Sequence, residues 1–449
     1  MKLLRSVEPE SIRSAIQDED RCDYVYSYPP RQAYRAFDDP EFAENTKRDD
    51  LKSLSSYNLY VHVPFCQQIC NFCNLYTTPS RHPEAHDTYV SMVIREADSL
   101  EQELSDKKVR TLYVGGGTPS LLQPDLLARL LSHLVKVFNF DILGLPEVAL
   151  EVAPETVTAQ KLVQMKEMGF NRINLGAQSL SSSELLQIGR RTSRDVLINQ
   201  VAVAQAVGFA NVCVDLIYGF RGQSLETWSQ SVREVVSLRP QTVCAYPLTL
   251  RSGTGFHHKG FTELDGAEQY RKYDIANSLL QEAGYEQQTH VRWAIPGIGG
   301  YLQKEYHWAS EPLVGLGAGA RSYLPSLDVR NGYSLGNRGK ALRDYSDHLS
   351  RSMSPVTDGF EMDADERRRK ALVLGLNRLD RQAFASTYGV DPWEQFSREF
   401  ELLLDLGLIT SENGVIQLTP LGLRHRDVAV QVFISEKVRG LVLGHRYDD

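Results

Sequence analysis

The sequence lacks a long hydrophobic run and a recognisable targeting segment. Its 449 residues contain no stretch of about eighteen consecutive apolar residues, which argues against a transmembrane helix. The first residues, MKLLRSVEPESIRSAIQDED, carry no apolar core of the kind that a signal peptide needs. We therefore expect a cytoplasmic protein with no membrane partner.

An excess of one charge is also missing. The chain has 49 lysines and arginines against 57 aspartates and glutamates, a formal net charge of -8, and the two signs are mixed along it. The sequence shows no strongly basic block of the kind that binds nucleic-acid phosphates or an anionic membrane surface. We expect a small-molecule substrate rather than a nucleic-acid partner.

Cysteine is scarce and unevenly placed. The chain has six cysteines, and in a reducing cytosol their uneven spacing argues against a disulfide framework. Cys66, Cys70 and Cys73 are crowded into PFCQQICNFCN, directly after a predicted strand. One loop thus supplies three thiolates, which favours a metal centre. The remaining cysteines are interpreted as isolated thiols: Cys22, Cys213 and Cys244.

The metal at the three clustered cysteines has two candidate forms. A structural zinc takes four ligands, usually from paired Cys-x-x-Cys knuckles, and the sequence has no second pair. A four-iron cluster held by three thiolates keeps one iron open, which is useful where a small molecule binds to it. The spacing and the missing fourth cysteine favour the cluster.

Short β-rich runs alternate with longer amphipathic segments over residues 57–250. This alternation is typical of parallel β/α units, whose crossovers are helices packed on the sheet. Six runs predict six strands, so we expect an α/β fold with a partial (β/α)6 barrel rather than a closed eightfold barrel. The predicted strands are 57–64, 109–117, 147–154, 172–179, 211–219 and 242–250.

The chain divides into four predicted regions. Residues 1–55 form an N-terminal extension whose YVYSYPPRQAYRAF segment is too rich in proline and aromatics for a regular helix. The barrel is expected over 56–260, and 261–350 is expected to connect to it and cap it. Two helical patterns followed by a turn-centred hairpin predict a winged-helix-like α+β module over 351–449.

The motifs at the predicted strand ends resemble those of the radical S-adenosylmethionine (SAM) superfamily. Its members carry Cys-x-x-x-Cys-x-x-Cys after the first strand of a partial barrel, and YVGGGTPS, ALEVAP, QIGRRTS and VCVDLIYG follow here in the expected order. The resemblance implies a [4Fe-4S] cluster on Cys66, Cys70 and Cys73 whose open iron binds SAM. It also implies reductive cleavage of SAM to a 5′-deoxyadenosyl radical, with a flavodoxin or ferredoxin as electron donor.

The same resemblance assigns SAM contacts to residues at several strand ends. A glycine-rich turn lets backbone approach a ligand where a Cβ would collide, and an acidic and a basic side chain suit the two charged ends of SAM. Some members of the family bind a second SAM; Tyr60 and Gln178 are expected beside it and are counted as catalytic together with the three cysteines. Ordinary barrel packing is the alternative for Tyr60 and Ile217. The expected SAM-binding set is Tyr60, Phe72, Gly116, Gly117, Thr118, Glu151, Gln178, Arg190, Asp215, Ile217 and Thr249.

Over residues 57–430 the chain resembles the oxygen-independent coproporphyrinogen III oxidase family, through LYVHVPFC, GFNRINLGAQS, VDLIYGFRGQSLETW and LVGLGAGARSY. The porphyrinogen-decarboxylating branch has a further cysteine two residues after the third, and Leu75 stands there. The heme-chaperone branch has His-Asn-x-x-Tyr-Trp before GLGAGA; here only Trp308 remains, with Gln303 in place of the histidine. Both departures disfavour these two activities.

A third branch comprises the class C radical SAM methyltransferases and cyclopropanases of natural-product pathways. This chain shares YSYPPRQAYR, FCNLYTT, YPLTLRSGTG and GARSY with them. There a second SAM donates one carbon to an sp² carbon, so the reacting atoms must lie within about 3–4 Å of one another with water excluded. We expect such a methyltransferase or cyclopropanase; a tetrapyrrole enzyme and a heme chaperone are the alternatives.

Methyl or methylene addition also needs a proton acceptor. Candidates lie in segments expected to close over the barrel mouth, although a single histidine or tyrosine is more often structural: His257, His290, Tyr306, His307 and Tyr323. The YPPRQAYR segment is expected either to cover the site or to pack as a proline-stiffened arm. Its candidate residues are Tyr28, Arg31 and Tyr34.

Overall fold

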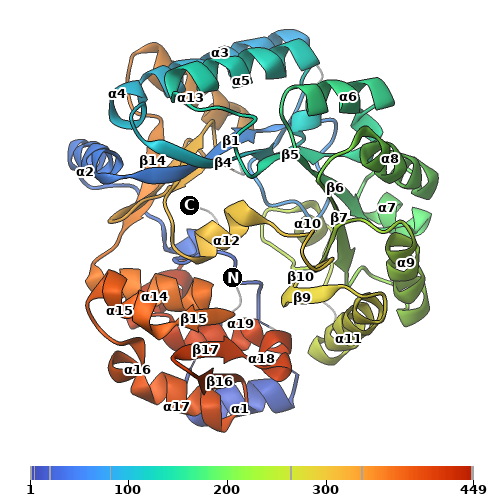
Figure 1. Ribbon diagram of the computed structural model, residues 1–449, viewed down its shortest axis with the longest axis vertical. Helices are drawn as coiled ribbons and strands as arrows, with labels where there is room; N and C mark the ends of the chain where they lie inside the picture. Colours follow the sequence, from blue (N-terminus) through green and yellow to red (C-terminus); the bar gives the residue numbers. More distant parts are fainter. Residues whose placement is uncertain are drawn as a thin grey trace.

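Six parallel strands form the centre of the molecule. The computed structural model describes residues 3–4, 6–19, 22–80, 82–262, 265–334 and 337–445. Strands β1, β4, β5, β6, β7 and β8 pair in that order and run parallel, which confirms the predicted partial barrel (Figure 1). Their bounds are Ser56–Val63, Lys108–Gly116, Val148–Val152, Arg172–Gln178, Asn211–Tyr218 and Thr242–Pro247.

The sheet continues beyond these six strands at both edges. β11 pairs parallel to β1 and is followed by β12, β13 and β14, while β10 and β9 pair antiparallel beyond β8, so this sheet has twelve strands within the described residues. The sequence did not predict the added strands because they are only 3 to 6 residues long, too short for a clear hydrophobic period. They are β9 (Glu286–Thr289), β10 (Arg292–Ala294), β11 (Leu313–Leu316), β12 (Arg321–Tyr323), β13 (Leu327–Asn331) and β14 (Val356–Glu361).

The two faces of the central strands differ in chemistry. On β7 the side chains of Val212, Val214 and Leu216 belong to the main hydrophobic core, whereas Cys213 and Asp215 alternate with them. Successive side chains point to opposite faces of a strand, so one face packs under helices and the other lines the inside of the barrel. The inside is therefore polar, unlike the apolar layers that fill a closed (β/α)8 barrel.

Helices cover the outer face of the sheet (Figure 1). On α5 the buried residues Leu127, Leu130, Leu131 and Leu134 recur at helical spacing and join the main core. The long covering helices are α3 (Pro83–Asp98), α5 (Pro124–Val137), α6 (Ala159–Glu167), α8 (Arg194–Val207), α9 (Leu225–Ser237), α11 (Gly266–Glu282) and α13 (Arg338–Ser350). The others around the barrel are α2 (Pro40–Ser53), α4 (Glu101–Leu104), α7 (Ser182–Gln187) and α10 (Gly255–His258).

A short helix, α12 (Leu302–Trp308), closes the barrel at the amino ends of its strands (Figure 1). The Glu147 carboxylate, just before β5, accepts hydrogen bonds from the backbone N–H groups of Leu302 (3.0 Å) and Gln303 (2.9 Å). The Gln303 amide donates to the Leu59 carbonyl at 2.9 Å. These contacts leave the carboxyl ends of the strands as the open side of the barrel.

Both ends of the chain contribute to a second hydrophobic core. The N-terminal helix α1 (Pro9–Gln17) and Tyr28 pack with the C-terminal module in one cluster. The Asp427 carboxylate accepts from the Val25 N–H at 2.9 Å, and Arg426 donates to the Val25 carbonyl at 2.8 Å. The four regions drawn from the sequence remain a prediction, although the extension and the last module share this core.

The C-terminal module contains the predicted hairpin. β16 and β17 pair antiparallel around Asn413 and Gly414, which have φ of 50° and 78°, as a tight Asn-Gly turn requires. A third strand, β15, adds to β17. The elements are α14 (Ala364–Gly375), β15 (Arg378–Asp380), α15 (Arg381–Tyr388), α16 (Pro392–Gln395), α17 (Ser397–Asp405), β16 (Ile409–Glu412), β17 (Val415–Leu418), α18 (Pro420–Arg424), α19 (Arg426–Ala429) and α20 (Glu436–Leu443).

Two of the cysteines interpreted as isolated thiols are neighbours. Cys213 on β7 and Cys244 on β8 lie with their sulfur atoms 3.8 Å apart. The sequence separation of these residues hides the contact, because it arises only from the pairing of the two strands. The interpretation as isolated thiols is therefore wrong for this pair.

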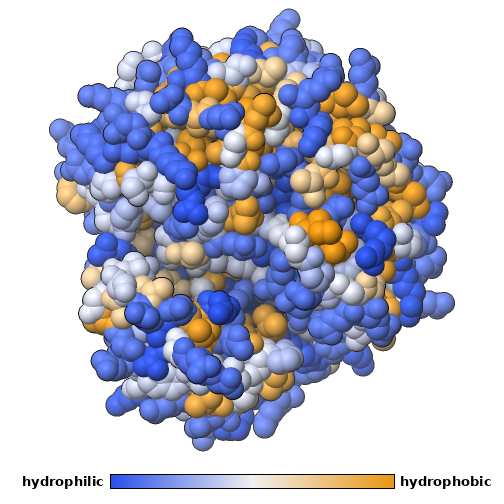
Figure 2. Space-filling view, viewed as in Figure 1, coloured by the Kyte–Doolittle hydropathy of each residue, from blue (hydrophilic) through white to orange (hydrophobic). Residues whose placement is uncertain are grey.

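The surface is mostly hydrophilic on the face shown in Figure 2, which is hollowed between the barrel and the C-terminal module. A cavity of about 490 Å³ lies there, lined by Arg292, Trp308, Asn377 and Phe384 among others. None of the helices in the described ranges is long and apolar enough to cross a bilayer.

The buried guanidinium of Arg426 is expected to hold the N-terminal segment on the C-terminal module. Arg426→Met removes its hydrogen bonds to the carbonyls of Val25 and Val373, both 2.8 Å. It also removes the guanidinium beside the buried Asp427 carboxylate, which keeps His290 at 3.5 Å. We expect the free energy of unfolding to fall by about 2–4 kcal/mol, measured by urea denaturation. Arg351→Met, at an exposed position, is the control; equal stability of the two variants would contradict this role.

Candidate active site at the three-cysteine loop

A cavity of about 470 Å³ lies over the carboxyl ends of the central strands. Its volume is in the range of small-molecule sites. All three clustered cysteines line it, together with residues from the ends of β4, β5, β6, β7 and β8. The parallel arrangement of the strands gathers these separate motifs at one place, as the sequence predicts.

The cysteine loop leaves β1 through the short strand β2 (Phe65–Cys66), which pairs with β3 (Thr78–Pro79). Backbone hydrogen bonds fix its middle: the Asn71 N–H donates to the Ile188 carbonyl at 3.0 Å, and the Asn71 carbonyl accepts from the Phe256 N–H at 2.8 Å. Arg338 donates to the Thr77 carbonyl at 2.7 Å. The loop is thus held at both its middle and its end, so the three sulfur atoms share a fixed frame.

The three thiols lie where negative charge is costly. Burial raises the pKa of Cys66 and of Cys70 to about 12, and it also raises the pKa of Cys73. Near neutral pH these side chains ionise only when a cation binds them. Three sulfur donors on one loop fit a metal centre, and in a four-iron cluster they would leave one iron for another ligand. The donor set therefore fits the expected cluster.

The glycine-rich turn after β4 packs against the cysteine loop. Gly116 has φ of 113°, which favours glycine. A Cβ on Gly117 would meet the Phe65 carbonyl oxygen at 2.6 Å. The Thr118 hydroxyl donates to the Cys66 sulfur at 3.6 Å. Close approach of backbone to the loop is thus one reason for the glycines, and all three residues line the cavity.

Glu151 and Arg190 both line the cavity. Glu151 is held by hydrogen bonds from neutral groups, whereas Arg190 forms an ion pair with Glu155. The Glu151 carboxylate accepts from the Tyr113 hydroxyl at 2.7 Å and from the Gly116 N–H at 2.8 Å, and burial raises its pKa to about 7. Arg190 donates through one nitrogen to both oxygens of Glu155 at 2.8 Å. A guanidinium with such a partner has less charge to offer a ligand.

The expected SAM-binding residues gather at this cavity with one exception. Gln178 stands at the irregular end of β6 with φ of 68°, a conformation that is uncommon for a residue with a side chain and is typical of functional sites. Tyr60 is not among the lining residues; its hydroxyl is 3.0 Å from Nδ1 of His62 and its ring stacks on Tyr113. The expected residues that line the cavity are Phe72, Gly116, Gly117, Thr118, Glu151, Gln178, Arg190, Asp215, Ile217 and Thr249.

The N-terminal extension supplies part of the cavity wall. Tyr24 and Tyr26 line the cavity, as does Arg251, which forms an ion pair with Asp23. Burial by itself would raise the pKa of Tyr26, but nearby guanidinium groups, chiefly that of Arg321, lower it to about 8. The alternation of tyrosines in YVYSY could have indicated an extended segment with one aromatic face. The candidates predicted from the sequence are instead Tyr28, Arg31 and Tyr34, which follow in the chain.

Tyr28, Arg31 and Tyr34 are not among the residues that line the cavity. Tyr28 and Tyr34 are buried in the core shared by the chain ends, so they pack as part of an arm. Arg31 donates to the Asn74 carbonyl at 3.1 Å and so ties this arm to the cysteine loop. None of the five described proton-acceptor candidates lines the cavity: His257, His290, Tyr306, His307 and Tyr323.

Two positions separate the branches of the resembling family. Leu75, at the position of the additional cysteine, lines the cavity with 47% of its surface exposed. Gln303, at the position of the chaperone histidine, is buried, and its amide donates to the Leu59 carbonyl and, at 3.3 Å, to the Thr111 hydroxyl. The Gln303 side-chain amide therefore donates its hydrogen bonds to groups inside the barrel.

Comparisons with known proteins agree with this architecture. Residues 60–235 match the radical SAM superfamily and residues 362–425 match the HemN C-terminal domain. The solved structure of coproporphyrinogen III oxidase (HemN) from Escherichia coli superimposes with a TM-score of 0.78 at 21% identity, covering 91% of this chain and 96% of that one. This structural likeness confirms the fold.

Curated relatives are similar over much of their length. The heme chaperone HemW of Bacillus subtilis is 28% identical over 386 residues, 84% of this chain and 99% of that protein. HemW of Lactococcus lactis is 30% identical over 276 residues, 61% of this chain and 71% of its own length. The oxygen-independent coproporphyrinogen III oxidase of Salmonella typhimurium is 25% identical over 453 residues, 93% and 95% of the two chains. The chain belongs to the radical SAM superfamily and, within it, to the coproporphyrinogen III oxidase-like family of HemN and HemW.

Proposed function

We propose that this radical SAM enzyme binds SAM in the 470 Å³ cavity and transfers one carbon from a second SAM to an sp² carbon of a small molecule. The observation that carries the radical chemistry is the convergence of three thiols with the strand-end residues around one cavity. When bound, the cluster supplies the electron that cleaves SAM to a 5′-deoxyadenosyl radical.

The residues of this chain would bind and orient SAM. Glu151, held by Tyr113 and Gly116, would accept hydrogen bonds from the SAM amino group. Ile217 and Leu248 belong to a small apolar cluster at the cavity wall, which would exclude water from the radical. Tyr26, whose pKa is about 8, is a better-placed proton acceptor than the candidates chosen from the sequence.

A tetrapyrrole reaction is the second candidate, and the relatives support it better than they support carbon transfer. Their names are heme chaperone and coproporphyrinogen III oxidase, and none of those reported above is a methyltransferase. Two features of this chain disfavour the decarboxylase and the chaperone: Leu75 replaces the additional cysteine, and Gln303 replaces the histidine, with its amide used inside the barrel. In addition, the cavity-lining Arg190 and Arg251 are already paired with carboxylates.

Labelled SAM separates these reactions. Anaerobic incubation of the reconstituted enzyme with methyl-labelled SAM and candidate unsaturated substrates is expected to put label into product, with equal amounts of 5′-deoxyadenosine and S-adenosylhomocysteine. Carbon dioxide released from coproporphyrinogen would instead establish the decarboxylase. A stable heme complex that forms neither by-product would establish the chaperone.

Cys73→Ala is expected to abolish SAM cleavage, because two remaining thiolates do not hold a four-iron cluster. The rate of 5′-deoxyadenosine formation should fall by more than about 100-fold, the upper range for loss of even outer-shell partners of metal sites. Iron and sulfide content should fall with it. Cys22→Ala, in the core shared by the chain ends, is the matched control and should keep both. Unchanged iron content and rate in Cys73→Ala would refute the cluster assignment.

SAM affinity is expected to depend on the ionisation of Glu151. Its pKa of about 7 means that the carboxylate is charged above that pH and neutral below it, so affinity should rise severalfold from about pH 6 to about pH 7.5. Glu151→Gln is expected to remove this contribution of the carboxylate to the rise. Calorimetric titrations at both pH values test the difference. Parallel pH profiles for the two proteins would exclude the contact.

A further inference from the structure

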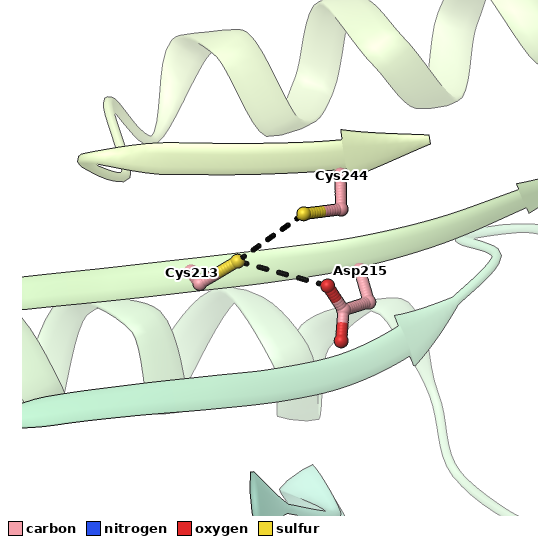
Figure 3. Close-up of side chains that lie close together, drawn as sticks. All are labelled: Cys213, Asp215 and Cys244. Atoms are coloured by element: carbon pink, nitrogen blue, oxygen red, sulfur yellow. Dashed lines mark hydrogen bonds between the residues drawn. The ribbon is translucent and has the colours of Figure 1, made fainter. Parts of the chain in front are cut away.

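A cluster of three ligand-type side chains lies inside the barrel, away from the cysteine loop in sequence. Cys213 and Asp215 project from β7, and Cys244 projects from β8 toward them (Figure 3). The two sulfur atoms are 3.8 Å apart, and the Cys213 sulfur is 3.6 Å from Oδ1 of Asp215. One donor atom from each residue lies within 4.8 Å of the other two.

Strand geometry accounts for this convergence. Cys213 and Asp215 are two residues apart on β7, so their side chains point to the same face, and Asp215 pairs directly with Cys244 on the adjacent strand. Side chains of paired residues on neighbouring strands are close together. The three donors are therefore fixed by the sheet rather than by a flexible loop.

Two of the three donor spacings match those of ligands on one tetrahedral ion, and the third pair, Cys244 and Asp215, lies within 4.8 Å. Two thiolates bound at about 2.3 Å with tetrahedral angles lie about 3.8 Å apart. A thiolate and a carboxylate oxygen bound at about 2.3 and 2.0 Å lie about 3.5 Å apart. The observed 3.8 and 3.6 Å agree with both values. A disulfide is a poorer match, because its sulfur atoms are only about 2.05 Å apart, and it gives the carboxylate no role.

We propose that Cys213, Cys244 and Asp215 bind a thiophilic divalent cation of the zinc type beside the cavity. Two sulfur donors favour such an ion over magnesium or calcium. Three protein ligands leave the fourth position for water or for a donor atom of a bound molecule, which is the arrangement of catalytic rather than structural zinc. The site is independent of the iron–sulfur cluster.

The Cys244 contact and burial raise the pKa of Cys213, and burial raises that of Asp215, but nearby guanidinium groups offset part of the cost of negative charge. The guanidinium of Arg172 stabilises negative charge on both thiols, and that of Arg292 does so on Cys244. These cations are themselves paired, with Glu147 at 3.8 Å and Glu305 at 3.2 Å. Asp215 lines the 470 Å³ cavity, which gives the ion a route from solvent. The carboxylate has two oxygens, so one can face the ion while the other faces the cavity.

Zinc loading of the full-length protein tests the site. The reconstituted enzyme is equilibrated anaerobically with Zn²⁺, desalted and analysed by mass spectrometry of metals and by X-ray absorption at the zinc edge. We expect about one zinc per chain with two sulfur neighbours and the remainder oxygen. Cys213→Ser and Cys244→Ser should each reduce the bound zinc to near zero. Cys22→Ser, another buried cysteine, should retain it.

A variant without the three loop cysteines distinguishes zinc bound at Cys213, Asp215 and Cys244 from zinc bound at the cysteine loop. The same zinc series in a Cys66→Ala/Cys70→Ala/Cys73→Ala protein removes the loop as a zinc ligand, and zinc should still bind with two sulfur neighbours. Asp215→Asn, a milder change, should also weaken zinc binding. It provides the test if a serine variant fails to fold. Zinc content unchanged by the serine substitutions, a zinc edge without sulfur neighbours, or a Cys213–Cys244 disulfide in anaerobically purified protein would overturn the proposal. SAM cleavage is measured separately for the cysteine variants, and Asp215→Asn is read for zinc content alone, because Asp215 is also an expected SAM-binding residue at the cavity.

Discussion

The main constraint on this site is that the thiols of Cys66, Cys70 and Cys73 must ionise to bind a metal, while burial raises their pKa values. The cysteine loop is pinned by backbone contacts to the segments that follow β6 and β8, and by an arginine on α13. Because the loop cannot relax into solvent, a cation is what stabilises its ionised form. The glycine turn after β4, the carboxylate at the end of β5 and the bent end of β6 surround the same point. The fixed loop and the groups around it thus together determine how negative charge is stabilised in the cavity.

The six central strands and the location of the main site could be predicted from the sequence because both follow from local patterns. Hydrophobic runs of strand length alternate with helical periods, and parallel strands place their carboxyl ends together. The short edge strands were not predictable, since 3 to 6 residues carry too little periodicity. Tyr24 and Tyr26 were missed because their approach to the cavity depends on long-range packing of the extension against the C-terminal module.

The contact between Cys213 and Cys244 likewise could not be predicted from local sequence patterns. Thirty-one residues separate them, and only strand pairing brings them together. Tyr60 was expected beside a ligand from its position in a family motif; its hydroxyl lies 3.0 Å from Nδ1 of His62 and its ring stacks on Tyr113, and the ligand contact stays a prediction. Motif position predicts which strand end a residue occupies better than it predicts which way the side chain is used.

The shared core of the two chain ends has a consequence for the cavity wall. Val25 is held by Arg426 and Asp427, while its neighbours Asp23 and Tyr24 contact Arg251 and Tyr246 of the barrel. The segment is thus anchored on two sides. A displacement of the C-terminal module would therefore be transmitted to Tyr24 and Tyr26 at the cavity wall.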